Sequence, residues 1–431
     1  MKFSSTRGNA PAVGFSQALL QGLAPDGGLY VPPEWPASAA GAVAGESLPA
    51  IGERVIGPFA AGDALESSLP AILGEAFNFP APLQAVGDGA RLLVLELFHG
   101  PTAAFKDFGA RFLAASLARI ERAQGKTLRV LVATSGDTGG AVAAAFHRRA
   151  GTEVVVLFPK GGVSPTQQQQ LTCWGDNVTS LAVRGSFDDC QRLVKEAFMD
   201  PALRARVEMS SANSINLGRL LPQTVYYAAS SLAVMRATGQ RACYVIPSGN
   251  LGNSVACLWA REMGFPIQRI VLAHNANRTV PDFLTTGQLL PRPSIATLAS
   301  AMDVGNPSNL ERMLALYPDA RTLAEQVSAV SVSDEAIRAR IRADFARYGQ
   351  VWCPHTATAA EVYANLPAAE RDAHPWVLVA TAHPAKFREI VEPLVGSVPV
   401  PENLRRLYDL PSQFTEIDPT LTALQHATDH C

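Results

Sequence analysis

From residue 92 onward the chain alternates short apolar runs with longer helix-like segments, and this alternation constrains the possible folds more than any other feature. A short apolar run, a helix and a second apolar run together are typical of a βαβ unit. Repeats of that unit predict an α/β protein with a mostly parallel sheet. The expected strands are residues 92–98, 128–133, 153–158, 178–183, 242–246, 267–273 and 377–381.

The rest of the chain is less regular. Residues 1–90 mix helical stretches with turns rich in proline and glycine, and residues 274–351 contain polar turns before a charged helix at 333–348. The mostly polar tail after Pro399 is expected to pack along the surface. Because 431 residues are many for one hydrophobic core, we expect two or three domains. Further helices are expected at residues 187–198 and 217–237.

Composition excludes several classes of protein. Hydrophobic residues make up 48% of the chain and charged residues 17%, which favours a well-buried globular protein over a disordered one. The net charge of −2 leaves no basic excess for binding nucleic acid or an anionic membrane. The sequence lacks an apolar run of membrane-spanning length and a signal-peptide apolar region, so a cytoplasmic location is expected.

The cysteines and histidines do not predict a metal centre. Six cysteines are present, none in CxxC spacing, which favours reduced and mostly packed thiols. His426, His430 and Cys431 could hold a stray ion at the C-terminus, where chain ends fray. The sequence has no HExxH motif, and we expect no functional metal site.

Lys106 occupies an unusual position between Phe105 and Phe108. It follows the predicted strand at 92–98 and a turn, and it begins an apolar-periodic helix. Partial shielding from water lowers the pKa of a lysine, and a neutral amine can attack a carbonyl carbon. The alternative is a surface lysine with a buried stem and a solvated ammonium group.

Two glycine-containing loops, at residues 133–141 and 247–256, each connect a predicted strand to a predicted helix, at residues 139–146 and 255–263. Backbone N–H groups at a helix N-terminus suit a carboxylate or a phosphate, and ligands bind parallel sheets at the carboxyl ends of the strands. Neither loop matches the nucleotide P-loop or the GxGxxG dinucleotide fingerprint. Each loop taken alone could be only a tight turn.

The order of these features resembles a known family. A lysine, a small-residue anion loop and then a GNxGN loop is the order seen in pyridoxal phosphate (PLP) enzymes of the tryptophan-synthase-β type, fold type II. Within that group the chain closely resembles the threonine synthase family, in its long bacterial and fungal branch. The stretches that carry this resemblance are residues 22–32, GLAPDGGLYVP; 213–227, NSINLGRLLPQTVYY; 302–312, MDVGNPSNLER; and 381–387, TAHPAKF.

The resemblance implies an architecture and a cofactor. It implies two open, mostly parallel sheet domains with helices on both faces, an N-terminal mixed α/β extension, and pyridoxal 5′-phosphate as cofactor. The implied extension covers residues 1–90, and the implied catalytic region covers 91–431. Within that region, about 110–235 form a smaller substrate-loop subdomain, and 91–109 with 236–431 form a larger cofactor-phosphate subdomain.

The resemblance also implies roles for individual residues. Lys106 is the Schiff-base lysine, Thr381 meets the pyridine nitrogen, and Asp137 lies nearest the 3′ oxygen of the cofactor, where the wider group often has asparagine. The residues implied to hold the cofactor phosphate are Gly249, Asn250, Leu251, Gly252 and Asn253. Those implied to grip the substrate carboxylate are Ser135, Gly136 and Thr138, and those for the substrate phosphate are Asn213, Ser214 and Arg219.

For three of these residues a purely structural role stays open as an alternative. Asp137 could cap a helix beginning at Thr138 or Gly139, and Thr381 could cap the helix after its strand. Arg219 could be solvated on a helix that has Asn216 as its N-cap. Two further residues, Lys386 and His383, add positive charge in a direction that the sequence does not determine.

The activity that the resemblance implies is conversion of O-phospho-L-homoserine and water to L-threonine and phosphate, the last step of threonine biosynthesis. A phospho-lyase that releases 2-oxobutyrate would use the same motifs. The predicted phosphate residues argue against a serine/threonine dehydratase, and Lys106 with both loops argues against a non-catalytic PLP-binding protein. The expected binding partner is the small-molecule substrate. The protein itself is expected to be a monomer or a homodimer.

Overall fold

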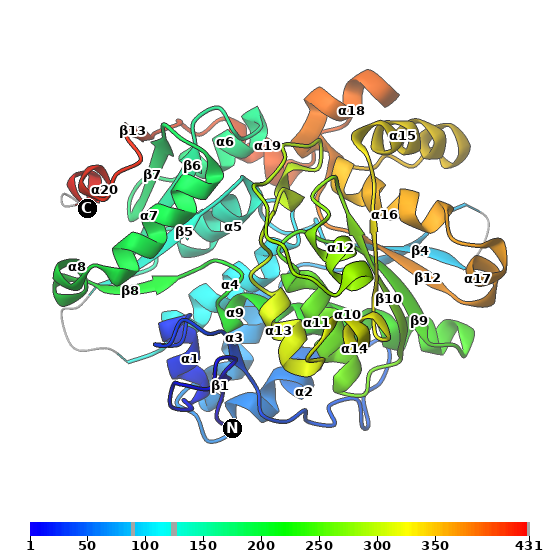
Figure 1. The fold of residues 1–431 in the computed structure, drawn as a ribbon, viewed down its shortest axis with the longest axis horizontal. Helices are drawn as coiled ribbons and strands as arrows, with labels where there is room; N and C mark the ends of the chain where they lie inside the picture. Colours follow the sequence, from blue (N-terminus) through cyan, green and yellow to red (C-terminus); the bar gives the residue numbers. More distant parts are fainter. Residues whose placement is uncertain (88–90, 122–126, 429–431) are drawn as a thin grey trace.

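Two separate sheets form the centre of the molecule, the larger on the right of Figure 1 and the smaller on the left. The computed structural model describes residues 1–87, 91–121 and 127–428. In the larger sheet all strands run parallel except the last, which is antiparallel to its neighbour. Its strands, in order across the sheet, are β11 (Ser328–Ser331), β10 (Ile267–His274), β9 (Ala242–Pro247), β12 (Trp376–Ala380), β4 (Leu92–Glu96) and β3 (Leu83–Ala85).

The smaller sheet is parallel throughout. Successive side chains of its β5 strand point to opposite faces, so Val130 and Val132 pack into one hydrophobic cluster and Leu131 and Ala133 into another. Burial on both faces explains the continuous apolar run that this strand shows in the sequence. The strands, in order, are β13 (Thr415–Ile417), β7 (Val178–Val183), β6 (Thr152–Pro159), β5 (Leu128–Ala133) and β8 (Glu208–Ser211).

Helices cover both faces of both sheets. On the smaller sheet, α5 and α7 both contact β5 and β6, and α5 shares the cluster of Val130 whereas α7 shares that of Leu131. On the larger sheet, α10 and α11 pack on one face and α16 on the other. These helices are α5 (Asp137–Phe146), α7 (Phe187–Met199), α10 (Gln223–Thr238), α11 (Gly252–Glu262) and α16 (Pro354–Ala364).

The N-terminal residues, blue at the bottom of Figure 1, pack beneath the sheets. A short antiparallel pair, β1 (Ser4–Ser5) with β2 (Tyr30–Val31), accompanies three helices. Here α1 and α3 contact α4, and α2 contacts α10. The helices are α1 (Phe15–Gln21), α2 (Leu48–Ala60), α3 (Leu69–Ala76) and α4 (Lys106–Leu117).

The predicted fold class is confirmed, and all seven predicted strands are present. The structure adds β3, β8, β11 and β13, which are short and carry polar residues. The helix predicted at 217–237 is two helices, α9 (Leu217–Leu220) and α10, because Pro222 interrupts the run. The predicted domain boundaries stay a prediction; β13, from the C-terminal tail, pairs with β7 and therefore lies in the smaller sheet.

The remaining helices lie between and around these elements. Among the described residues, no helix has both the length and the hydrophobicity that crossing a bilayer requires. These helices are α6 (Pro165–Thr172), α8 (Pro201–Arg206), α12 (Thr279–Thr286), α13 (Leu310–Leu316), α14 (Ala320–Ala324), α15 (Asp334–Tyr348), α17 (Ala368–Ala373), α18 (Arg388–Val395), α19 (Glu402–Tyr408) and α20 (Leu421–Thr428). The 3-10 helices are η1 (Glu66–Ser68), η2 (Ser300–Met302) and η3 (Pro384–Phe387).

Candidate active site

A cleft between the two sheets is lined by every site residue predicted from the sequence except Gly136. The carboxyl ends of β5, β9 and β12 and the segment after β4 supply its walls, as expected for parallel sheets. Ser135 and Asp137, the two neighbours of Gly136, do line the cleft. The other lining residues among those predicted are Lys106, Thr138, Asn213, Ser214, Arg219, Gly249, Asn250, Leu251, Gly252, Asn253 and Thr381.

Lys106 is the first residue of α4, and its side chain is partly buried. The Phe105 N–H donates to the Thr381 carbonyl at 2.9 Å, which ties the start of α4 to the end of β12. Burial is the main cause that lowers the pKa of Lys106 to about 8, and the positive charges of Arg219 and Lys386 lower it further. The attraction of Asp137 opposes these effects. A lysine in this state is deprotonated at mildly basic pH and can act as a nucleophile.

The loop after β9 makes a close turn into α11. Leu251 has a φ of 64°, and a Cβ on Gly249 would lie 2.7 Å from the Met302 Cα, so the close approach of these two segments requires glycine. The amides in the first turn of α11 have no acceptor within the helix. They are free to bind an anion in the cleft.

The Asn253 side chain is oriented by two tyrosines. Its Oδ1 accepts from the Tyr227 hydroxyl at 2.9 Å and from the Tyr226 hydroxyl at 2.5 Å. Its buried Nδ2 has no hydrogen-bond partner among the described residues. Because an unpaired buried donor is costly, this N–H group is suited to a ligand oxygen.

A second polar cluster connects the predicted cofactor loop with the predicted substrate residues. The Asn250 Nδ2 donates to the Ser214 Oγ at 2.6 Å, and the Asn309 Nδ2 donates to the Asn250 carbonyl at 3.0 Å. Arg312, fully buried, donates to the carbonyls of Ser214 and Ile215. Asn309 and Arg312 lie in the 302–312 stretch that carried the family resemblance, but the sequence did not reveal this bracing role.

In the loop after β5, Gly136 has a φ of 131°, a backbone conformation that glycine adopts readily and other residues rarely do. The Thr134 Oγ1 accepts from the N–H groups of Gly136 and Gly139, both at 2.9 Å. The helix begins at Asp137 itself, with Gly136 as its N-cap residue. The capping role that was open for Asp137 is therefore wrong, because its carboxylate bonds to side chains instead.

Those side chains are Lys386 and Gln167. The Lys386 Nζ lies 2.9 Å from the Asp137 Oδ1, and the Gln167 Nε2 donates to the same oxygen at 3.0 Å. Burial alone would raise the pKa of Asp137, but the positive charges of Lys386 and Lys106 outweigh it and hold that pKa well below its usual range. Asp137 is therefore an anion at neutral pH. The direction of Lys386, undetermined by the sequence, is toward Asp137, which lines the cleft.

Arg219 is buried, with 3% of its surface exposed, so the solvated alternative is wrong. Asn216 is nevertheless the N-cap of α9, because its side chain accepts from the Gly218 N–H at 2.8 Å. Arg219 donates to the Ala212 carbonyl, and its Nε has no partner among the described residues. The Asn213 Nδ2 donates to the Ala133 carbonyl at 2.8 Å. The cleft therefore contains a buried guanidinium with unused donor capacity.

His355, which the sequence analysis did not identify, also lines the cleft. It lies on α16 and accepts from the Ala301 N–H at 3.1 Å through Nε2. Burial is the main cause that lowers its pKa to about 4, so it is neutral at pH 7. Thr381, 6% exposed, is followed by η3, whose N-cap is His383. The capping alternative for Thr381 is therefore wrong.

No group of three or more potential metal ligands occurs among the described residues. His430 and Cys431, which with His426 formed the candidate for a stray ion, lie outside them. The five cysteines that are described are free and buried.

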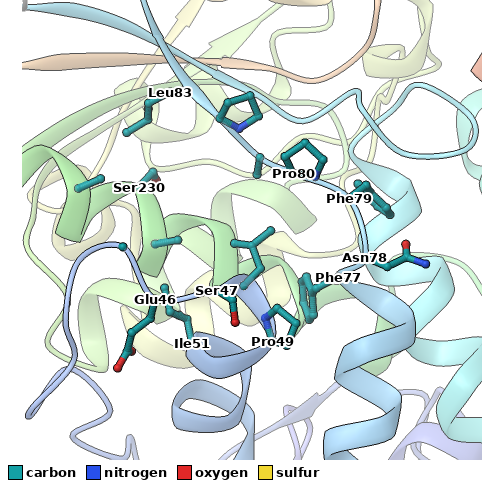
Figure 2. Close-up of a pocket in the computed structure, with 16 residues that line it drawn as sticks. Glu46, Ser47, Pro49, Ile51, Phe77, Asn78, Phe79, Pro80, Leu83 and Ser230 are labelled. Carbon is teal, nitrogen blue, oxygen red and sulfur yellow. The ribbon is translucent and has the colours of Figure 1, made fainter. Parts of the chain in front are cut away.

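A second hollow, the N-terminal groove, shares no lining residue with this cleft. Figure 2 shows the residues that line the groove. Its walls are largely apolar, and among the described residues that line it Glu46 alone is charged. Glu46 is paired with Arg54 at 2.8 Å. The groove is lined by residues 45–49, Ile51, residues 77–83, Ala229, Ser230 and Ala233.

Comparison with known proteins defines the class of this fold and site. The family described as "Pyridoxal-phosphate dependent enzyme" matches residues 78–382, more than half of the chain. Families described as "Threonine synthase N terminus" and "Threonine synthase, C-terminal" match residues 2–77 and 356–427. The chain belongs to the threonine synthase family, which confirms the predicted family and its cofactor.

Individual relatives support the same assignment along the whole chain. The threonine synthase of Haemophilus influenzae is 40% identical over 409 residues, 94% of both chains, and that of Serratia marcescens 38% identical over 415 residues, 95% of both. The crystal structure of PLP-bound threonine synthase from Brucella melitensis matches with a TM-score of 0.90 at 35% identity, covering 100% of this chain and 99% of that one. Yeast threonine synthase matches with a TM-score of 0.89 at 27% identity, covering 99% and 98%.

The residues present fit the cofactor. The free amides at the start of α11 and the unpaired Asn253 Nδ2 suit its phosphate. Lys106, with its lowered pKa, suits its aldehyde, and Thr381 lies at the end of the neighbouring strand β12.

Proposed function

We propose that the protein converts O-phospho-L-homoserine and water to L-threonine and phosphate. The observation that carries this proposal is that one cleft holds both the reactive Lys106 amine and the buried Arg219 guanidinium with an unpaired Nε. An enzyme for a phosphorylated amino acid needs a proton-transferring amine and a phosphate-binding cation within the length of one small substrate.

Each part of the cleft has a proposed role. When bound, pyridoxal phosphate supplies the electron sink for negative charge that develops on the substrate. The loop at 249–253 would hold the cofactor phosphate, and the Thr381 hydroxyl would be the partner of its ring nitrogen. Lys106 would hold the cofactor, and its amine would carry protons to and from the substrate carbons.

The substrate is held at both ends. The loop from Ser135 to Thr138 presents backbone amides at the N-terminus of α5, which suit the substrate carboxylate. Arg219, with Asn213 and Ser214, binds the substrate phosphate by charge-assisted hydrogen bonds. Holding both ends fixes the carbons between them near Lys106 and reduces the entropy that the reaction must overcome.

One assay tests this function against its rivals. The purified protein is incubated with O-phospho-L-homoserine, and threonine, 2-oxobutyrate and phosphate are measured in the same sample. Threonine and phosphate in equal amounts are expected. Phosphate with 2-oxobutyrate in place of threonine identifies a phospho-lyase, and absence of all three contradicts the proposal. Lys106→Ala protein is the control for non-enzymatic release.

Two properties stay predictions from the sequence: a cytoplasmic location, and a monomeric or homodimeric state. Light scattering of the purified protein measures the second.

A further inference from the structure

Asp137 and Lys386 form an ion pair inside the protein. Asp137 is 4% exposed and Lys386 is 0% exposed, and their charged atoms are 2.9 Å apart. Most ion pairs of the described residues are at least partly exposed, as in the pair of Lys160 with Glu416. Burying two charges costs free energy that their attraction only partly returns. A contribution to stability therefore does not explain why this ion pair is present beside the cleft.

The position of Lys386 is fixed from several sides. Its Nζ also donates to the Thr102 carbonyl at 2.8 Å, and the Gln170 Nε2 donates to the same carbonyl at 2.9 Å. The Thr102 N–H and the Thr102 hydroxyl both donate to the Asp107 carboxylate, at 2.9 Å and 2.6 Å. The ammonium group is therefore held by two acceptors, the Asp137 carboxylate and a Thr102 carbonyl that is itself fixed in place.

Asp137 would otherwise be free to interact with Lys106. A carboxylate with one close ammonium has less attraction to offer a second, because the net charge that the second amine meets is near zero. The charged groups that act on the Lys106 amine are Asp137 from α5, Arg219 from α9 and Lys386 from η3. His355 from α16, which interacts with Asp137, is neutral at pH 7.

We propose that Lys386 is a positioning residue whose ammonium occupies Asp137, so that a larger fraction of the Lys106 amine is uncharged and able to react. This inference rests on the proposed function of Lys106. Removing Lys386 has two consequences with the same sign: Lys106 loses a repelling charge, and Asp137 becomes available to attract the Lys106 ammonium. Both favour the protonated, unreactive form of Lys106.

The test measures the reactivity of Lys106 directly. Full-length protein freed of cofactor is mixed with pyridoxal phosphate at a series of pH values, and the rate of covalent attachment is followed by absorbance. Borohydride reduction and peptide mapping then identify the modified lysine. In the natural protein the midpoint of the rate profile is expected near pH 8. In Lys386→Met it is expected to move up by at least one pH unit, which slows attachment at pH 7 about tenfold.

Two further variants separate this role from a merely structural one. Lys160→Met removes a lysine of a surface ion pair and is expected to leave the midpoint unchanged. In Asp137→Asn combined with Lys386→Met, the carboxylate that would attract Lys106 is gone as well. Its midpoint is therefore expected to lie below that of Lys386→Met.

An unchanged midpoint in folded Lys386→Met overturns the proposal. Attachment to a lysine other than Lys106 in the natural protein instead overturns the proposed function, so the two failures are distinct. If Lys386→Met does not fold, Asp137→Asn is compared with and without Lys386→Met. The proposal then requires the higher midpoint in the double variant, because the repelling ammonium is absent there, and equal midpoints contradict it.

Discussion

The cleft around Lys106 and the N-terminal groove are both hollows in this chain, but their walls carry different chemistry. The groove has a cavity volume of about 630 Å³ and the cleft one of about 120 Å³. Prolines, phenylalanines and alanines make up much of the wall of the groove, and its Glu46 is neutralised by Arg54. The smaller cleft is lined by Lys106, Asp137, Arg219 and His355.

This difference teaches that the state of the side chains identifies the site better than its size. In the cleft, burial shifts the pKa values of Lys106 and His355, and two buried donors on Arg219 and Asn253 lack partners among the described residues. Such groups are costly for stability, and a fold retains them where a ligand or a reaction uses them. Each of the following predictions alters a residue of the cleft or of the groove. Changes in the cleft should affect activity or its charge state, whereas a change in the groove should affect stability alone.

The largest effect is expected from Lys106→Ala. Removing the amine eliminates both covalent attachment of the cofactor and proton transfer, so turnover should fall by at least about a thousandfold. The product assay described above measures it, and borohydride should no longer fix the cofactor to the chain. Lys160→Ala is the matched control; if it loses as much activity as Lys106→Ala, the assignment of the reactive amine is wrong.

A smaller effect is expected from Arg219→Ala. Loss of a charge-assisted phosphate contact should cost about 2–4 kcal/mol in transition-state binding, or roughly thirty- to a thousandfold in kcat/KM. Cofactor content, measured by absorbance, should be retained. Arg192→Ala, which removes an exposed arginine on α7, should have no effect. Unchanged kinetics in Arg219→Ala would show that Arg219 braces the loop at Ala212 and does not touch the substrate.

The pH dependence of stability should also reveal that His355 in the cleft is buried in its neutral form. His355 has a pKa of about 4 in the folded protein against an ordinary value of 6.5, so below pH 6.5 the unfolded chain binds a proton that the folded protein does not. The contribution of His355 to stability is therefore lost as the pH falls from 6.5 toward 4. Between pH 7 and pH 5 this loss is about 2 kcal/mol.

Urea unfolding of the protein and of His355→Gln at both pH values measures this loss. The free energy of unfolding of the variant should fall less between pH 7 and pH 5, since glutamine does not titrate and can still accept from the Ala301 N–H. An equal decrease in both proteins would mean that His355 is not held neutral by burial.

The smallest effect on activity is expected in the groove. Phe79→Leu removes a ring contact with Phe108, whose centroid is 4.5 Å away, and should cost about 0.5–1.5 kcal/mol of stability. Activity per folded molecule should stay within about twofold, because Phe79 lines the groove and not the cleft. A tenfold loss of kcat/KM without unfolding would show that the groove is coupled to the cleft, and the contrast between them would fail.

Local pattern by itself determined much of this protein. Parallel strands that are buried on both faces, such as β5 and β9, require continuous apolar runs. Such a run can be recognised from the sequence without knowledge of the structure. The turn before Lys106 and the loop at 249–253 could also be predicted, because each is defined by residues close together in the sequence. In both, glycine lies between an apolar strand and a helix. The strands β8 and β13 were missed because they lie at the two edges of the smaller sheet and carry polar residues, which give no such run.

The charge state of the cleft was decided only by the tertiary structure. Asp137, Lys386 and His355 lie on α5, η3 and α16, and no periodicity links residues so distant along the chain. Their contacts depend on how these elements pack around the carboxyl ends of the strands. Burial and mutual attraction then set which of them carries a charge. Whether a charged side chain is solvated or buried beside a partner is a property of the packed interior. The sequence therefore left a solvated Arg219 open and left the direction of Lys386 undetermined, although the family resemblance already implied a site role for Arg219.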